Sequence, residues 1–152
     1  MAKLTIKDLG KVNEAIFQLS KIPNINNGGC GVSALALAEY IENNEDCSGG
    51  HKPRFVFLYH YHNDDLYSNN TKAQFDSKLI PKAPAHIVVL WKGLYIDSDG
   101  EHDITNYQYV QFINKKDFLI KAIKNINSWN RCFNRSNIKQ VKEALGVNLT
   151  DV

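Results

Sequence analysis

The chain has 152 residues, of which 43% are hydrophobic, with 18 Lys and Arg against 16 Asp and Glu. This length fits one domain over residues 1–152, and the near-neutral charge without a basic run gives no support for binding nucleic acid or anionic membranes. Because the chain has no apolar run of membrane-spanning length, no signal-peptide core and an odd number of cysteines, we expect a cytoplasmic protein without a disulfide framework.

The first half of the chain predicts two helices joined by a polar loop. Apolar residues at helical spacing from Leu9 to Leu19 indicate a helix over about 6–20, with Thr5 and Asp8 as a capping box. Pro23 and the Asn/Gly run that follows it end this helix. A second helix, rich in alanine and leucine, is predicted from about residue 30 to 43 and should be central and buried on most sides.

Cys30 opens this second helix within the sequence Gly28-Gly29-Cys30-Gly31. The first turn of a helix carries unpaired N–H groups and the positive end of the helix dipole, and both favour a thiolate over a thiol. We expect the flanking glycines to leave the sulfur sterically open and to let a substrate approach the backbone closely. This layout is typical of a nucleophile.

The second half predicts an antiparallel sheet followed by helices. Residues 54–61 read as a strand, 63–70 as a loop and 71–79 as a short helix, and two β-rich runs around Lys92-Gly93 predict a two-residue hairpin. Residues 107–113 add a third strand. Helices follow at about 115–126, capped by Asn114, and at about 137–145, capped by Ser136 and stopped by Gly146. The expected fold class is α+β, with N-terminal helices on a small antiparallel sheet and C-terminal helices on another side.

The hairpin register brings a histidine and two acids together. Counting back from Lys92-Gly93 places His86 opposite Asp99 and diagonal to Asp97, and the period of two puts all three on one face. A carboxylate that holds one imidazole nitrogen leaves the other free to take a proton from a thiol. Cys30, His86 and one of the two acids therefore supply a nucleophile, a base and an orienting group.

The segment Cys-Gly-Val-Ser-Ala-Leu-Ala-Leu-Ala, followed by His-Ile-Val-Val-Leu and Tyr-Ile-Asp, resembles the papain-like cysteine peptidase superfamily. Within it, the chain is most similar to the bacteriocin-leader-processing peptidases and to compact bacterial and phage members, over roughly residues 24–100. The resemblance implies a papain-like fold with Cys30 as nucleophile, His86 as general base and Asp97, in preference to Asp99, as the orienting residue. It also implies an oxyanion hole. The family usually has a glutamine six residues before the cysteine; this chain has Asn24 there, so Asn24 and Asn27 are the oxyanion candidates.

The expected function is that of a thiol-dependent hydrolase, a cysteine peptidase or amidase/isopeptidase acting on a peptide or protein through an acyl-enzyme, without a cofactor. The same intermediate would serve deamidation, transglutamination or acyl transfer. One alternative is a catalytically inactive papain-like domain that binds a partner. A second is a zinc site formed from Cys47, His51, His60 and His62, whose spacing matches no established zinc pattern. In the hydrolase interpretation, Cys47 and Cys132 have no role in the reaction.

Overall fold

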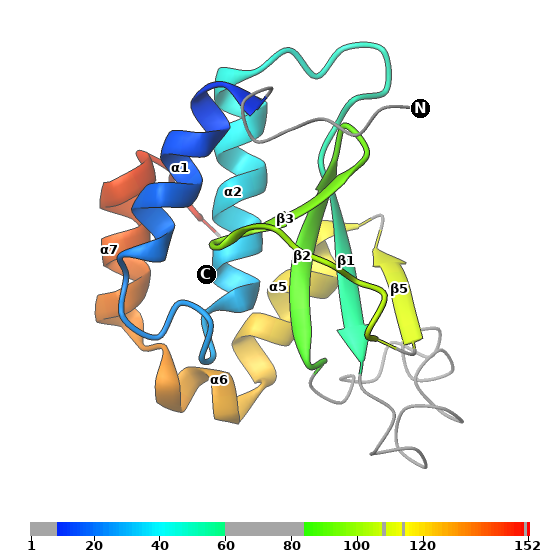
Figure 1. The fold of residues 1–152 in the computed structure, drawn as a ribbon. Coiled ribbons are helices and arrows are strands. Elements are labelled where there is room, and N and C mark those ends of the chain that lie inside the picture. The colour runs from blue at the N-terminus through cyan, green and yellow to red at the C-terminus, as the bar shows by residue number, and fades with distance from the viewer. Residues whose placement is uncertain (1–8, 60–83, 108, 114, 151) are drawn as a thin grey trace.

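A computed structural model describes residues 9–59, 84–107, 109–113, 115–150 and 152. Its helices form one layer and its sheet the other, with the second helix between them (Figure 1). The helices are α1 (Lys11–Ser20), α2 (Cys30–Asn44), α5 (Lys116–Asn125), α6 (Asn127–Cys132) and α7 (Arg135–Leu145). The strands are β1 (Arg54–Tyr59), β2 (His86–Trp91), β3 (Leu94–Asp97), β4 (Gly100–Glu101) and β5 (Tyr109–Ile113), in the sheet order β4-β3-β2-β1-β5. All the pairings are antiparallel, which confirms the α+β class.

The second helix, α2, is the centre of the core. Every residue from Cys30 to Ala38 is buried, because α1, α5 and α7 pack around this helix on three sides and β2 packs on the fourth. Three alanines and one glycine in this stretch are small enough to let the neighbouring elements approach closely. The prediction of a central, buried helix is confirmed.

The β2–β3 hairpin has the predicted loop. Trp91 pairs with Leu94 across Lys92-Gly93, and both loop residues have positive φ, 50° and 78°, as the favoured two-residue hairpin turn requires. Side chains on β2 alternate between two apolar clusters. Ile87, Val89 and Trp91 belong to the main core, whereas Val88 belongs to a smaller cluster that Leu90 packs against.

The N-terminal helix and the third strand differ from their predicted limits. Helix α1 begins at Lys11 rather than near residue 6, because Gly10, with φ 56°, interrupts the helical backbone before it. The predicted third strand is β5, which begins at Tyr109. The Thr5–Asp8 capping box, the loop at 63–70, the helix at 71–79 and the last two residues of the strand at 54–61 lie outside the described residues.

The C-terminal helices correct two predicted caps. Lys115, not Asn114, is the N-cap of α5 and makes no side-chain cap. Helix α7 is capped by Asn134 rather than Ser136. The Asn134 side chain accepts a hydrogen bond from the Asn137 backbone N–H at 3.2 Å, and the Asn137 side chain accepts one from the Asn134 backbone N–H at 3.0 Å. This capping box uses asparagine where glutamate or glutamine is usual, so the pattern did not indicate it. Gly146 ends α7 in the left-handed conformation, as predicted.

Two short elements, α6 and β4, were not predicted. At six and two residues, neither is long enough to show a hydrophobic period. Both lie next to the candidate site described below. Among the described residues, no helix combines the length and the apolar character needed to cross a membrane.

Candidate functional site

Three elements bring Cys30, His86 and Asp97 together. Cys30 is the first residue of α2, His86 is the first residue of β2 and Asp97 is the last residue of β3. The beginnings of α2 and β2 lie at the same end of the molecule (Figure 1), because β2 packs along α2. The hairpin then returns β3 to the same end. Cys30 and Asp97 are each 5% exposed, and His86 is nearly as buried.

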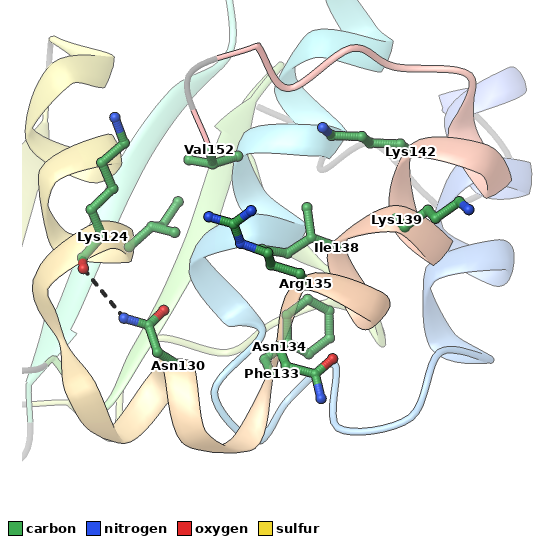
Figure 2. A pocket seen from close by; sticks show the side chains of 10 residues that line it. Lys124, Asn130, Phe133, Asn134, Arg135, Ile138, Lys139, Lys142 and Val152 are labelled. Atoms are coloured by element: carbon green, nitrogen blue, oxygen red, sulfur yellow. Dashed lines mark hydrogen bonds between the residues drawn. The ribbon is translucent and has the colours of Figure 1, made fainter.

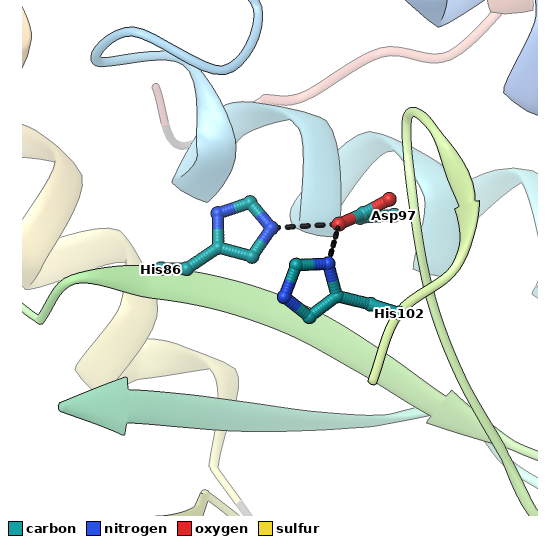
Figure 3. A group of neighbouring side chains, drawn as sticks. All are labelled: His86, Asp97 and His102. Atoms are coloured by element: carbon teal, nitrogen blue, oxygen red, sulfur yellow. Dashed lines mark hydrogen bonds and ion pairs between the residues drawn. The ribbon is translucent and has the colours of Figure 1, made fainter. Parts of the chain in front are cut away.

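His86 is held by Asp97 through one of its ring nitrogens. Its Nε2 lies 2.7 Å from Asp97 Oδ2, and its Nδ1 is turned away from Asp97 toward the ribbon of α2 (Figure 3). An ionised carboxylate can only accept, so Nε2 carries the proton that joins the pair. The Cys30 side chain raises the pKa of His86, so the two side chains interact, and Nδ1 is the ring nitrogen that Asp97 leaves free for Cys30.

These contacts favour the charged forms of His86 and Asp97. Burial by itself lowers the pKa of His86, but the hydrogen bond to Asp97, the hydrogen bond to Cys30 and the negative charge of both partners raise it to about 9. Burial likewise raises the pKa of Asp97, and the hydrogen bonds from His86 and from the Asp99 N–H outweigh burial and lower it. The histidine and the carboxylate therefore form a charge-assisted pair at neutral pH.

Asp99 does not face His86, and the predicted pairing of these two residues is wrong. The β2–β3 ladder runs from Trp91–Leu94 to Val89–Ile96, and the chain turns after Asp97 into β4. This turn forms because Asp97 Oδ1 accepts the Asp99 N–H at 2.8 Å. Asp99 instead accepts a hydrogen bond from Asn26 at 2.9 Å. The carboxylate that is hydrogen-bonded to His86 is thus that of Asp97.

His102 and Tyr107 extend the cluster, and no sequence argument singled them out. His102 Nδ1 lies 2.9 Å from the same Asp97 oxygen, Oδ2, that binds His86, and the two imidazole rings are 4.8 Å apart (Figure 3). The other nitrogen of His102 lies 3.1 Å from the Tyr107 hydroxyl. Burial, together with the charges of Asp97 and Cys30, raises the pKa of Tyr107, so its hydroxyl stays protonated and can donate to His102.

A signal for His102 was present in the chain. Asp97 pairs with Gly100 across Ser98-Asp99, so this is a second tight hairpin, and Ser and Asp are both common turn residues. Counting outward from that turn brings His102 beside Tyr95, whose carbonyl oxygen accepts the His102 N–H at 2.7 Å. The period of two then places His102 on the face of Asp97.

The glycines around Cys30 serve packing, and the expectation that they leave the sulfur open is wrong. A Cβ at Gly29 would lie 2.7 Å from the Phe133 ring, and one at Gly31 would lie 2.9 Å from the Trp129 ring. Gly28, with φ 92°, passes equally close to the Trp129 carbonyl oxygen. The loop and the first turn of α2 therefore pack closely against α6 and the residue that follows it.

The asparagines before Cys30 divide into two kinds. Asn26 joins the loop to the turn after Asp97 through two side-chain hydrogen bonds. It accepts one from the Ser98 hydroxyl at 2.8 Å and donates one to the Asp99 carboxylate. Asn24 and Asn27, the predicted oxyanion groups, are exposed, and within the described part of the chain neither side chain has a hydrogen-bond partner. Their role in an oxyanion hole stays a prediction.

The donor atoms of His86, Asp97 and His102 lie within 4.8 Å of one another, so their fit to a metal ion can be tested. Two ligands at about 2.05 Å from a tetrahedral zinc stand about 3.3 Å apart. The 2.7 and 2.9 Å separations from Asp97 Oδ2 are instead hydrogen-bond lengths. The three side chains therefore fit a hydrogen-bonded network. Of the four residues in the predicted zinc site, His60 and His62 lie outside the described residues.

Comparison of the chain with protein-family models, with curated protein sequences and with solved structures finds no match.

Proposed function

We propose that this protein is a thiol-dependent acyl hydrolase with a papain-like arrangement, in which Cys30, His86 and Asp97 form the catalytic triad. One observation carries the proposal. A buried cysteine at a helix N-terminus raises the pKa of a histidine that a buried carboxylate holds at 2.7 Å, so the three side chains form one interacting set. This arrangement supports the roles of nucleophile, base and orienting group for Cys30, His86 and Asp97.

In the proposed reaction, the Cys30 sulfur attacks the carbonyl carbon of the substrate, while the proton of the thiol resides on His86 Nδ1. His86 gives this proton to the leaving amine as the C–N bond breaks, which produces a thioester on Cys30. Water then attacks the thioester carbon and transfers a proton to His86. When the C–S bond breaks, the acid leaves and the thiol is restored. Asp97 accepts the Nε2–H of His86 throughout and stabilises the imidazolium.

The first turn of α2 is the proposed site for the negative oxygen of the tetrahedral intermediate. The first N–H groups of a helix have no partner inside the helix, and Gly29, the N-cap of α2, supplies no side-chain cap. The Cys30 N–H is the donor nearest to the sulfur along the chain. Asn24 and Asn27 are the candidate second donors.

His102 is a positioning residue in this proposal. Asp97 Oδ2 accepts from both histidines, so a neutral His102 donates through Nδ1–H and accepts from the Tyr107 hydroxyl through Nε2. Tyr107 and His102 thereby fix the carboxylate that orients His86. Replacement of His102 by glutamine, which keeps a donor, should preserve more activity than replacement by alanine. Both changes should shift the pH profile, because Asp97 loses a neighbour that stabilises its charge.

The experiment that tests the proposal uses a library of peptides derived from a cellular proteome, with cleavage products identified by mass spectrometry. The proposal predicts new termini with the wild-type protein and none with Cys30→Ala or His86→Gln. A labelled primary amine in the same reaction separates hydrolysis from acyl transfer, because the thioester transfers its acyl group to the amine. If no peptide or amine product depends on Cys30, the triad is inactive and the hydrolase proposal fails.

The inactive binding protein and the metalloprotein are the competing interpretations. An inactive domain predicts no Cys30-dependent product and equal alkylation of all three cysteines. A zinc site formed from Cys47, His51, His60 and His62 predicts stoichiometric zinc on elemental analysis of the purified protein, with loss of that zinc in Cys47→Ala. Absence of bound metal, with Cys30-dependent cleavage, rejects both.

A further inference from the structure

A basic groove lies on the helical side of the molecule. It runs between α5 and α6 on one side and α7 on the other, and has a volume of about 800 Å³ (Figure 2). Among the described residues, its lining includes four cationic side chains and no acidic side chain. These are Lys124 from α5 and Arg135, Lys139 and Lys142 from α7.

The four cations of the basic groove make no ion pair with any residue that the structure describes. No Asp or Glu side chain is among the described residues that line the groove. Like charges that share one groove repel one another, so an anionic ligand would relieve that repulsion. Arg135 adds a second indication. It is the first residue of α7, where the helix dipole disfavours a positive side chain, so it does not serve the stability of the helix.

We propose that the basic groove binds an acidic peptide segment of a partner protein. The cations on α7 occupy positions 135, 139 and 142, so they extend over two turns, or about 10 Å along the axis. A single phosphate would need them to converge on one point. A run of acidic residues matches a spread of this length, because an extended chain rises about 3.3 Å per residue.

The remaining lining of the basic groove suits a peptide better than a nucleic acid. Ile138 and Val152, which are partly exposed, offer apolar surface for side chains between the acidic ones, and the amides of Asn130 and Asn134 can bond a peptide backbone. Single-stranded nucleic acid is held mainly by stacking on exposed aromatic rings. The aromatic residue in this groove, Phe133, is 2% exposed and packs against Gly29.

The basic groove is separate from the triad, so the proposal does not rest on the proposed hydrolase activity. Helix α6 lies between the two sites: Asn130 of α6 lines the groove, and Trp129 of α6 packs against the glycines around Cys30. Phe133 lines the groove, and its ring also contacts the loop that leads into Cys30. A partner bound in the groove would therefore dock on the helix that supports the nucleophile.

The test is a binding titration with the full chain at low salt. The probe is a fluorescein-labelled ten-residue peptide in which glutamates surround two leucines, and its control has glutamine in place of every glutamate. The proposal predicts saturable binding of the acidic peptide only, and affinity at least about tenfold weaker for the triple variant Arg135→Gln, Lys139→Gln, Lys142→Gln. The matched control, Lys11→Gln, Lys21→Gln, Lys92→Gln, changes the net charge equally at exposed positions outside the groove and should bind within about twofold of wild type.

Three results would overturn the proposal. Equal loss of binding in both triple variants would mean that net charge alone attracts the peptide. Displacement of the peptide by millimolar inorganic phosphate would identify a single-anion site, and tighter binding of a single-stranded oligonucleotide would identify a nucleic-acid site. Circular dichroism of both variants checks that they fold, which is expected because the substituted side chains are exposed or only partly buried.

Discussion

The raised pKa of His86 makes the stability of this protein depend on pH above neutrality. The folded protein binds the His86 proton more tightly than the unfolded chain does, because the pKa rises from 6.5 to about 9. This stabilisation is fully present below pH 6.5 and is lost as the pH rises through about 9. Since a tenfold change in proton affinity corresponds to about 1.4 kcal/mol, the loss over this interval is roughly 3 kcal/mol.

Asp97 sets the lower pH limit of the range in which the protein is most stable. Its pKa is lowered in the folded protein, so its contribution is present above its unfolded value of 3.8 and is lost as the pH falls below it. The free energy of unfolding should therefore be highest between about pH 4 and 6.5. Denaturant titrations at intervals from pH 4 to 10 measure this profile, and NMR of the His86 ring follows its titration directly.

The variant Asp97→Asn removes the negative partner and nearly preserves the size of the side chain. Without that charge the pKa of His86 should drop, since burial by itself lowers it, and the loss of stability from pH 6.5 to 9 should largely disappear. The reasoning fails if wild-type stability is constant over this interval, or if His86 titrates near 6.5 in both proteins.

Three further substitutions test the structure around the site. Gly29→Ala should destabilise the protein by about 1–3 kcal/mol in thermal or denaturant unfolding, because its Cβ would lie 2.7 Å from the Phe133 ring; an unchanged midpoint would contradict this packing. Ser33→Ala should leave stability equal or higher, since the Ser33 hydroxyl is buried without a hydrogen-bond partner among the described residues. Asn26→Ala should lower the free energy of unfolding by about 1–2 kcal/mol, measured in the same way, because Ser98 and Asp99 lose their hydrogen bonds to Asn26.

The parts of the fold that could be predicted are those with a local pattern. The alanine and leucine run after Cys30 indicates a buried helix whatever packs around it, and Lys92-Gly93 between two β-rich runs determines the register of the hairpin. From that register, His86 and Asp97 were expected on one face, and the structure joins them at 2.7 Å.

The parts that could not be predicted depend on contacts between distant segments. The glycines beside Cys30 suggested an open thiol, and their packing against Trp129 and Phe133 involves α6, a helix too short to show a hydrophobic period. The predicted pairing of His86 with Asp99 assumed a hairpin that continues, whereas the Asp97 side chain ends it by bonding the Asp99 N–H. That same turn carries His102 to Asp97, so one turn accounts for both differences.

The measurement that tests the central claim most directly is the rate at which iodoacetamide alkylates each cysteine at pH 7, read by mass spectrometry. Burial and the nearby Glu42 and Asp46 raise the pKa of Cys47, so this thiol serves as a slow internal reference. If His86 activates Cys30, the Cys30 rate should exceed the Cys47 and Cys132 rates by at least about tenfold, and His86→Gln should abolish the difference. Equal rates at all three cysteines, or a Cys30 rate unchanged in His86→Gln, would contradict the proposed triad.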